Sequence, residues 1–220
     1  MTIVIAILIA ILFGAHALFA AHGGFSDPEA VLATHLHLLL AQLVSTVWLW
    51  AYINPVLVDI ATDTPKRNEM TMANVSLGRY LSKFHIRSLI IRLMPVMILM
   101  TATLSANIWC VMRRGGILSL LHAAATLSIG MLPIAVTFLG ILSHLGRVLR
   151  GANLAKYYGP ILGITVGCIS VVVTMALEPL LFRGDLSLPI GLLALLAFAV
   201  WGNLWVEWRK MNRLWLSPVP

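Results

Sequence analysis

The chain has 220 residues, of which 60% are hydrophobic and only 10% are charged. Soluble domains carry roughly 25% charged residues, so this composition excludes an ordinary water-soluble globule. The net charge of +7 would suit a nucleic-acid-binding domain, but in a chain this apolar it points to membrane topology instead.

Apolar segments long enough to cross a membrane recur along the whole sequence. A crossing helix needs about 20 apolar residues. The first segment lacks the basic start of a signal peptide, so we expect a membrane helix there as well. We predict a single membrane-embedded domain over residues 1–220. Its fold is an all-α bundle of six transmembrane helices at 2–21, 30–54, 89–112, 117–145, 158–182 and 187–208.

The basic residues between these segments are distributed unevenly. If the N terminus faces the cytoplasm, the outer loops hold only three, Arg113, Arg114 and Arg183, and the inner side holds twelve. Basic residues collect on the cytoplasmic side, so both termini are predicted to be cytoplasmic. We expect a multi-pass protein of a bacterial inner (plasma) membrane, with the lipid bilayer as partner and no nucleic acid.

The longest polar stretch, 61–84, separates the second and third predicted spans. Arg79, Lys83 and Arg87 recur there every four residues, which predicts an amphipathic helix over 76–86 with one basic face. Such a face contacts anionic headgroups or docks a partner subunit. Four tryptophans near the end of the last span predict an interfacial aromatic belt: Trp201, Trp205, Trp208 and Trp215.

Five of the seven histidines lie near the predicted outer ends of spans: His16, His22, His35, His37 and His122. At about 1.5 Å per residue, all five fall within roughly 10 Å of the outer surface. Imidazole is costly to place in hydrocarbon, so histidines inside a membrane often mark a ligand, a metal or a proton path. The plainer interpretation, hydrogen bonding between helices, stays open.

Helical periodicity places two of these histidines on polar faces. His35 shares a face with Gln42, Ser45 and Thr46, which should turn toward other helices. His122 shares a face with Thr126, Thr137 and small residues, over which a flat cofactor could approach closely. His37 points elsewhere, and the sequence does not decide whether His35 or His37 faces the interior.

Two imidazoles from facing helices can hold the iron of a b-type haem. We therefore expect His35 or His37 to face His122, with His16 as the substitute. The expected cofactor-binding residues are His16, His35, His37, His122, Gln42 and Thr126.

The fifth predicted span carries Gly163 and Gly167, a spacing that lets another helix approach closely. Glu178, near its outer end, lies at the level of the histidines. An acid there could relay a proton from a quinol or balance the charge of a metal.

A second interpretation is a transition-metal permease, most plausibly for copper. Met94 and Met97 share one face of the third span, and soft thioethers suit Cu(I). The expected metal-binding residues are His22, His35, His37, His122, Met94, Met97 and Glu178. A third interpretation is a cofactor-free accessory subunit whose apolar faces pack on a larger membrane complex.

Two segments resemble the copper-resistance D-type and membrane protoporphyrinogen-oxidase-type families of small multi-helix haem proteins. One is the second span, from His37 through LLLAQLVSTVWLWAYINPVLV, and the other is the fourth, from LLHAAATL to LSHLGRVLRG. The resemblance implies a haem-b subunit that exchanges electrons with quinol near the outer face, beside a redox partner. It carries residue roles over only to His37 and His122.

The chain departs from these families in two places. Asn54-Pro55-Val56 stands where the first motif closes with Pro-Arg, and His122 and His144 are farther apart than the family pattern. Because His144 is close to Arg147, we expect it at the membrane interface rather than at a second haem.

Overall fold

The computed structural model describes residues 2–21, 28–112, 117–151, 161, 163–165, 167–169, 171–173 and 187–217. These residues are helical almost throughout and contain no strand, which confirms the all-α class. The long helices are α1 (Thr2–Ala20), α2 (Pro28–Trp48), α6 (Ile86–Met112), α7 (Ile117–Leu149) and α9 (Ser187–Trp215). The shorter pieces are η2 (Leu49–Ile53, π-helical), α3 (Asn54–Thr62), α4 (Thr64–Met72), α5 (Leu77–Tyr80) and η3 (Leu81–His85, π-helical).

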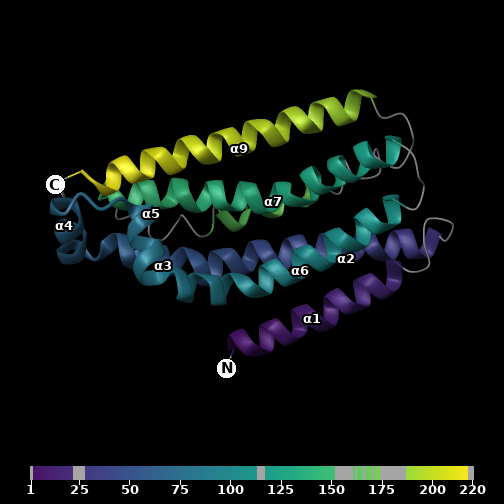
Figure 1. Cartoon of the computed structure of the whole chain (residues 1–220), viewed down its shortest axis with the longest axis horizontal. Coiled ribbons are helices and arrows are strands. Elements are labelled where there is room, and N and C mark those ends of the chain that lie inside the picture. The colour runs from purple at the N-terminus through teal and green to yellow at the C-terminus, as the bar shows by residue number, and fades with distance from the viewer. Residues whose placement is uncertain are drawn as a thin grey trace.

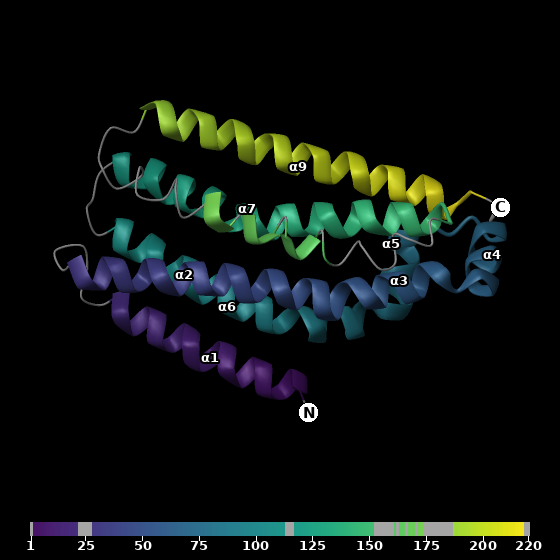
Figure 2. The same cartoon turned by 180° about the vertical axis from the view of Figure 1, so that it is seen from behind.

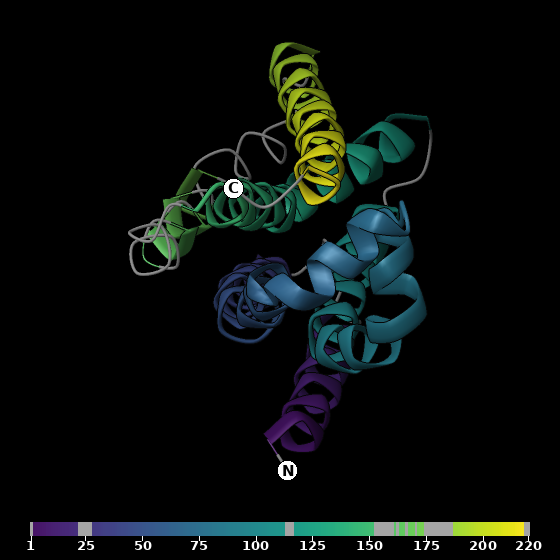
Figure 3. The ribbon, with the colours of Figure 1, turned by 90° about the vertical axis from the view of Figure 1, so that its left-hand side faces the viewer.

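The five long helices run along one common direction (Figure 1). α3, α4, α5 and the C-terminal end of α9 gather at one end of the bundle, as both side views show (Figures 1 and 2). The end-on view places α1 and α9 at opposite edges, with α2, α6 and α7 between them (Figure 3). We call the end with α4 the basic end, because its helices carry Lys66, Arg67, Arg79, Lys83, Arg147 and Arg150.

By length and composition, four helices in the described part can cross a membrane: Thr2–Ala20, Leu32–Thr62, Leu77–Cys110 and Ala123–Leu149. The second and third are longer than the sequence predicts, because α2, η2 and α3 form one rod and α5, η3 and α6 form another. The predicted sixth span lies within α9, and most of the predicted fifth lies outside the described residues. Several membrane-crossing helices are thus confirmed.

The two long rods extend past α1 at the basic end. Rods of 31 and 34 residues are about 46–51 Å long, whereas the hydrocarbon layer is about 30 Å thick. α1, with 19 residues, is about as long as the layer is thick. It lies parallel to α6, with Gly14 beside Ala102 and the Ala21 carbonyl 3.7 Å from Cys110 Sγ. The surplus length of the rods therefore lies at the basic end.

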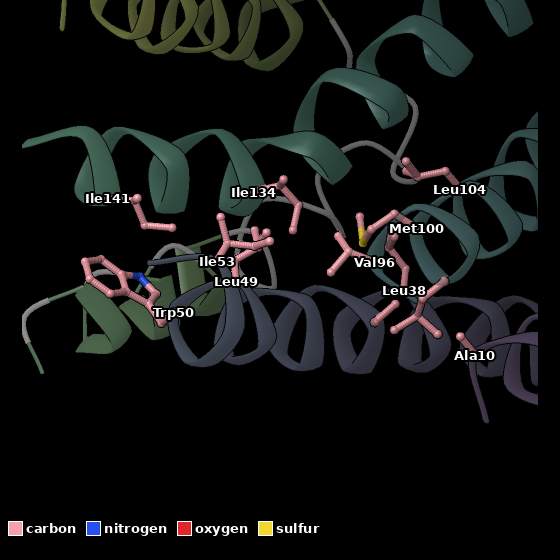
Figure 4. Packing of buried hydrophobic residues seen from close by; sticks show 12 residues of the cluster. Ala10, Leu38, Leu49, Trp50, Ile53, Val96, Met100, Leu104, Ile134 and Ile141 are labelled. Carbon is pink, nitrogen blue, oxygen red and sulfur yellow. The ribbon is translucent and has the colours of Figure 1, made fainter. Parts of the chain in front are cut away.

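One hydrophobic core lies along the crossing segments and another lies at the basic end. The first joins α1, α2, η2, α6 and α7 along the crossing segments and is seen in Figure 4 around Leu38, Leu49, Trp50 and Met100. The second fills the basic end with Val58, Leu77, Tyr80, Leu145, Met211 and Trp215. We call this second core and its helices the juxtamembrane layer. The polar stretch 61–84 is thus largely helical and packed, and the predicted helix over 76–86 is present as α5 and η3.

Trp215 does not belong to an interfacial belt, contrary to the expectation from sequence. Its side chain is 1% exposed, and its Nε1 donates a hydrogen bond of 3.1 Å to the carbonyl of Val75. Its ring stacks 5.5 Å from that of Tyr80. Trp201 and Trp205 are exposed, as a belt requires. The reason for the difference is that α9 ends inside the juxtamembrane layer, against α4 and α5.

Arg67 links the helices of the juxtamembrane layer through hydrogen bonds. Its side chain is 4% exposed and donates hydrogen bonds to the carbonyls of Leu149, Leu214 and Ser217 at 3.4, 2.8 and 3.3 Å. These carbonyls end α7 and α9, where the helix dipoles are negative and favour a cation. Burial lowers the pKa of the guanidinium by desolvation.

Candidate functional site

Two of the predicted outer histidines meet across the interface between α1 and α2. His16 Nδ1 lies 2.7 Å from His37 Nε2, and the ring centres are 4.9 Å apart. The other ring nitrogen of His37 hydrogen-bonds the carbonyl of Ala33, one turn earlier. Phe13 packs on His37 with ring centres 4.9 Å apart. The structure therefore brings imidazoles from separate helices together at one depth.

The hydrogen-bond partners determine which ring nitrogens of His16 and His37 carry a hydrogen. A carbonyl oxygen only accepts, so His37 carries hydrogen on Nδ1 and its Nε2 is an acceptor. His16 Nδ1 therefore donates to His37 Nε2. A backbone carbonyl holding one ring nitrogen is also how metal-binding histidines are oriented. The pair can thus hold either an extra proton or a metal ion.

This contact places His37 against α1, whereas His122 belongs to α7. His37 is one of the two alternatives expected opposite His122, and α1 lies beside this face of α2 and offers it His16 instead. Periodicity along α2 alone cannot show which helix is the neighbour.

His35 is the histidine of α2 that turns toward the bundle. It is half-buried, and its Nδ1 atom is shielded from solvent. It shares a helix face with Gln42, whose side chain is fully buried and donates a 3.1 Å hydrogen bond to the carbonyl of Gly130 in α7. His35 thus shares a helix face with a residue that contacts α7, whereas His37 contacts α1.

The register of α2 and α7 sets the depth of His122. Three contacts show that the two helices run parallel: Gln42–Gly130, Thr46–Thr137 and Asn54–His144. His122 lies two turns before Gly130, farther from the basic end. This register therefore places the backbone of His122 at the depth of His35. The side chain of His122 lies outside the described part, as do His22 and Glu178.

Two facing stripes of polar residues line the interface of α2 and α7. On α2, Gln42, Ser45 and Thr46 are 0% exposed, and on α7 Thr126 is 2% and Thr137 0% exposed. The Thr137 hydroxyl donates to Thr46 Oγ1 at 3.4 Å. The polar faces predicted for both helices are therefore buried between helices, as expected.

Three side-chain atoms of the α2 stripe have no hydrogen-bond partner: Gln42 Oε1, Ser45 Oγ and Trp50 Nε1. Buried polar groups nearly always have a protein or water partner, because an unpaired one is costly. These atoms therefore mark places where water or a polar ligand is expected.

His144 lies at the basic end of the same stripes and is buried between helices rather than exposed beside Arg147. It is 4% exposed, and its Nδ1 lies 3.0 Å from Asn54 Oδ1. Its ring centre is 6.0 Å from that of Trp50. Sequence reasoning missed this contact because Arg147 drew attention to the surface. The sequence signal that could have predicted the contact is a polar side chain at every fourth position from 42 to 54.

The two glycines of the fifth predicted span fit against these stripes. A Cβ on Gly163 would lie 1.5 Å from Trp50 Cζ2, and one on Gly167 would lie 2.0 Å from Thr46 Cγ2. Only glycine fits at such distances, so the predicted close approach is confirmed, although the partners are side chains rather than a helix backbone.

The methionines do not join the histidines. Met94 and Met97 are 39% and 60% exposed. Met97 lines a groove of 660 Å³ between α6, α7 and α9, whereas His16 and His37 lie between α1 and α2. Within the described residues, no group of three or more His, Cys, Asp or Glu side chains is placed to hold a metal ion.

Comparison with known proteins gives no relative. No protein-family model, no curated protein and no solved structure matches this chain.

Proposed function

We propose that this chain is a six-span haem-b subunit of a bacterial inner membrane, with both termini cytoplasmic, that exchanges electrons with quinol near the outer face beside a redox partner. The observation that supports it best is the placement of His35. It shares a helix face with Gln42, which contacts α7, and it lies at the depth of the His122 backbone on that helix.

The residues present suit a haem in their chemistry. Two imidazoles on neighbouring helices are the donors that a b-type haem takes in helix bundles, and the bound iron supplies one-electron chemistry. His35 and His122 would hold the group. The Gln42–Gly130 hydrogen bond keeps α2 against α7 beneath them, and the buried Thr126 adds a hydroxyl on the same face of α7 as His122. His37 is not assigned to the haem, because His16 occupies its Nε2.

An absorption spectrum of protein purified from haem-supplied cells tests this proposal. We expect a Soret band that shifts on reduction, lost in His35→Ala and in His122→Ala. His85→Ala is the matched control, because His85 contacts Tyr80 in the juxtamembrane layer at 3.3 Å and should keep the band. A colourless wild-type protein would refute the proposal, and so would a band that survives both ligand variants.

A second candidate function, transition-metal handling with copper as the leading ion, is favoured by the His16–His37 contact. Metal–imidazole bonds are about 2 Å long, so the two nitrogens would separate from 2.7 Å to about 3–4 Å on binding. His37 is already oriented by the Ala33 carbonyl, and exposed His16 is free of packing that would hold it in place.

Competition with a Cu(I) chelator tests this candidate. Wild-type protein should withdraw one Cu(I) from the chelator, and His16→Ala and His37→Ala should not, whereas His85→Ala should bind normally. Equal binding by all four proteins would rule out the pair as the site. Protein that is both colourless and metal-free would leave the accessory-subunit interpretation.

A further inference from the structure

Polar residues recur at nearly every turn along the rod formed by α2, η2 and α3. Gln42, Thr46, Trp50 and Asn54 are spaced by four residues, so each polar group lies about 6 Å from the next, and the whole row spans about 18 Å. All four are buried, with exposures of 0%, 0%, 3% and 2%. A helix needs few such groups for packing, because each is costly in hydrocarbon.

α7 supplies the opposite side of the same row. Thr137 donates to the Pro133 carbonyl at 2.7 Å and lies 3.4 Å from Thr46 Oγ1. His144 contacts Asn54 at 3.0 Å. Hydroxyl, amide and imidazole groups of both helices therefore alternate along one line.

Toward the end of the bundle opposite the basic end, buried Leu38 follows Gln42 on α2, and the next buried polar residues lie on α7, on α6 and one turn farther along α2. Thr126 is 2% exposed there, and Asn107 of α6 donates to the carbonyl of Thr34 at 3.1 Å. Thr34 and Asn54 lie 20 residues apart, about 30 Å, which equals the thickness of the hydrocarbon layer.

The row also has places for water. Gln42 Oε1, Ser45 Oγ and Trp50 Nε1 are buried without a partner. A water molecule bonded to such atoms would bridge the gaps between successive side chains.

We propose that this row is a proton path across the membrane, entered at His144 from the basic end. In each step one proton moves from an O–H or N–H donor to the next oxygen or imidazole nitrogen, so that one proton enters for each that leaves. Trp50 Nε1–H only donates, so water carries the proton past it. An imidazole can accept a proton on one ring nitrogen and release one from the other, and His144 is anchored on Asn54. The path does not require haem or a metal ion.

Proton flux into vesicles tests the path. Purified protein is reconstituted with a pH dye inside, and a potassium diffusion potential is applied with valinomycin. Wild-type protein should acidify the vesicles faster than protein-free vesicles do. Gln42→Leu, Thr46→Val and His144→Phe should each reduce the rate to near that of empty vesicles.

Thr103→Val is the matched control. Thr103 is also 0% exposed, but its hydroxyl donates to Leu99 and Met100 of its own helix. It should conduct like wild type. Thr46→Val keeps the volume of the side chain, so a folded variant is expected, and its melting temperature checks this. Wild-type flux equal to that of empty vesicles would overturn the proposal. A stable Thr46→Val with wild-type flux would also overturn it, because the row would then serve packing alone.

Discussion

At the scale of single residues, the neighbour of each imidazole decides what that imidazole can do. His37 is bonded on both ring nitrogens, to His16 and to Ala33, and has no free nitrogen for a haem. His35 differs by only two positions but shares a helix face with Gln42, which contacts α7. His144, beside a surface arginine in the sequence, is buried against Asn54.

A double-mutant cycle on His144 and Asn54 should reveal direct coupling. Each single change to Leu leaves one buried polar group unpaired, which costs about 1–3 kcal/mol. The double variant should lose less stability than the two single variants lose together. The difference should be about 0.6–1.7 kcal/mol, as found for hydrogen bonds between membrane helices. Thermal unfolding in detergent measures this, and strict additivity would show that the contact contributes nothing.

Much of the polar interface could be predicted from the sequence, because burial follows helical periodicity. Gln42, Ser45, Thr46, Thr126 and Thr137 are all buried as expected. The direction of His37 could not be predicted, since it depends on where α1 packs. That packing rests on small residues such as Gly14, whose partner Ala102 lies far along the chain.

At the scale of helices, the structure depends on close packing of side chains against glycines and on hydrogen bonds that join the ends of helices. Trp50 lies against Gly163, and α7 and α9 end at one arginine. The rods of α2, η2 and α3 and of α5, η3 and α6 are longer than the predicted spans, because the polar residues after 54 and before 89 are helical too. The chain remains helical through these residues, with π-helical turns at Leu49–Ile53 and Leu81–His85.

Gly163→Ala should destabilise the protein by about 1–3 kcal/mol, because the new methyl group overlaps the Trp50 ring. Trp50→Leu in the same protein should recover part of the loss by making room. Gly202→Ala is the control, since nothing lies within 4 Å of its added methyl group. Denaturation in detergent compares the four proteins. A Gly163→Ala variant as stable as Gly202→Ala would contradict the close packing of Gly163 against Trp50.

Arg67→Met should loosen the juxtamembrane layer by about 1.5–3 kcal/mol, the usual contribution of hydrogen bonds to a charged group. Arg67→Lys should recover little, because one ammonium cannot match the planar fork that reaches three carbonyls. Hydrogen exchange should rise at the C-terminal ends of α7 and α9. Arg79→Met removes an exposed charge and should leave exchange unchanged.

At the scale of the whole molecule, the bundle has a crossing layer and a packed layer beyond it at the basic end. The exposed side chains of α1 and α9 are large and apolar, including Leu12 at 71% and Phe198 at 80%. Such faces suit lipid or the helices of a partner. The predicted number of spans rests on the lengths of the apolar segments, and the predicted side of each terminus rests on charge counting. Both use the sequence and not the packing.

Cysteine labelling tests the predicted topology. In a background with Cys110→Ala and Cys168→Ala, Met72→Cys places a thiol at a position that is 88% exposed in α4. An impermeant maleimide should label it in inverted vesicles and not in whole cells. Arg114→Cys, in the predicted outer loop, should show the reverse. Labelling of Met72→Cys from outside the cell would invert the orientation.

The arginine that joins α7 to α9 also sets an order of assembly during synthesis. Arg67 leaves the ribosome well before residues 214–217, which supply two of its three carbonyl partners. Until those residues have been made, its charge has to stay hydrated and α4 cannot close on the bundle. The basic end is therefore the last region to become compact, and a nascent chain halted before α9 would present Tyr80 and Leu145 to the translation machinery and its chaperones.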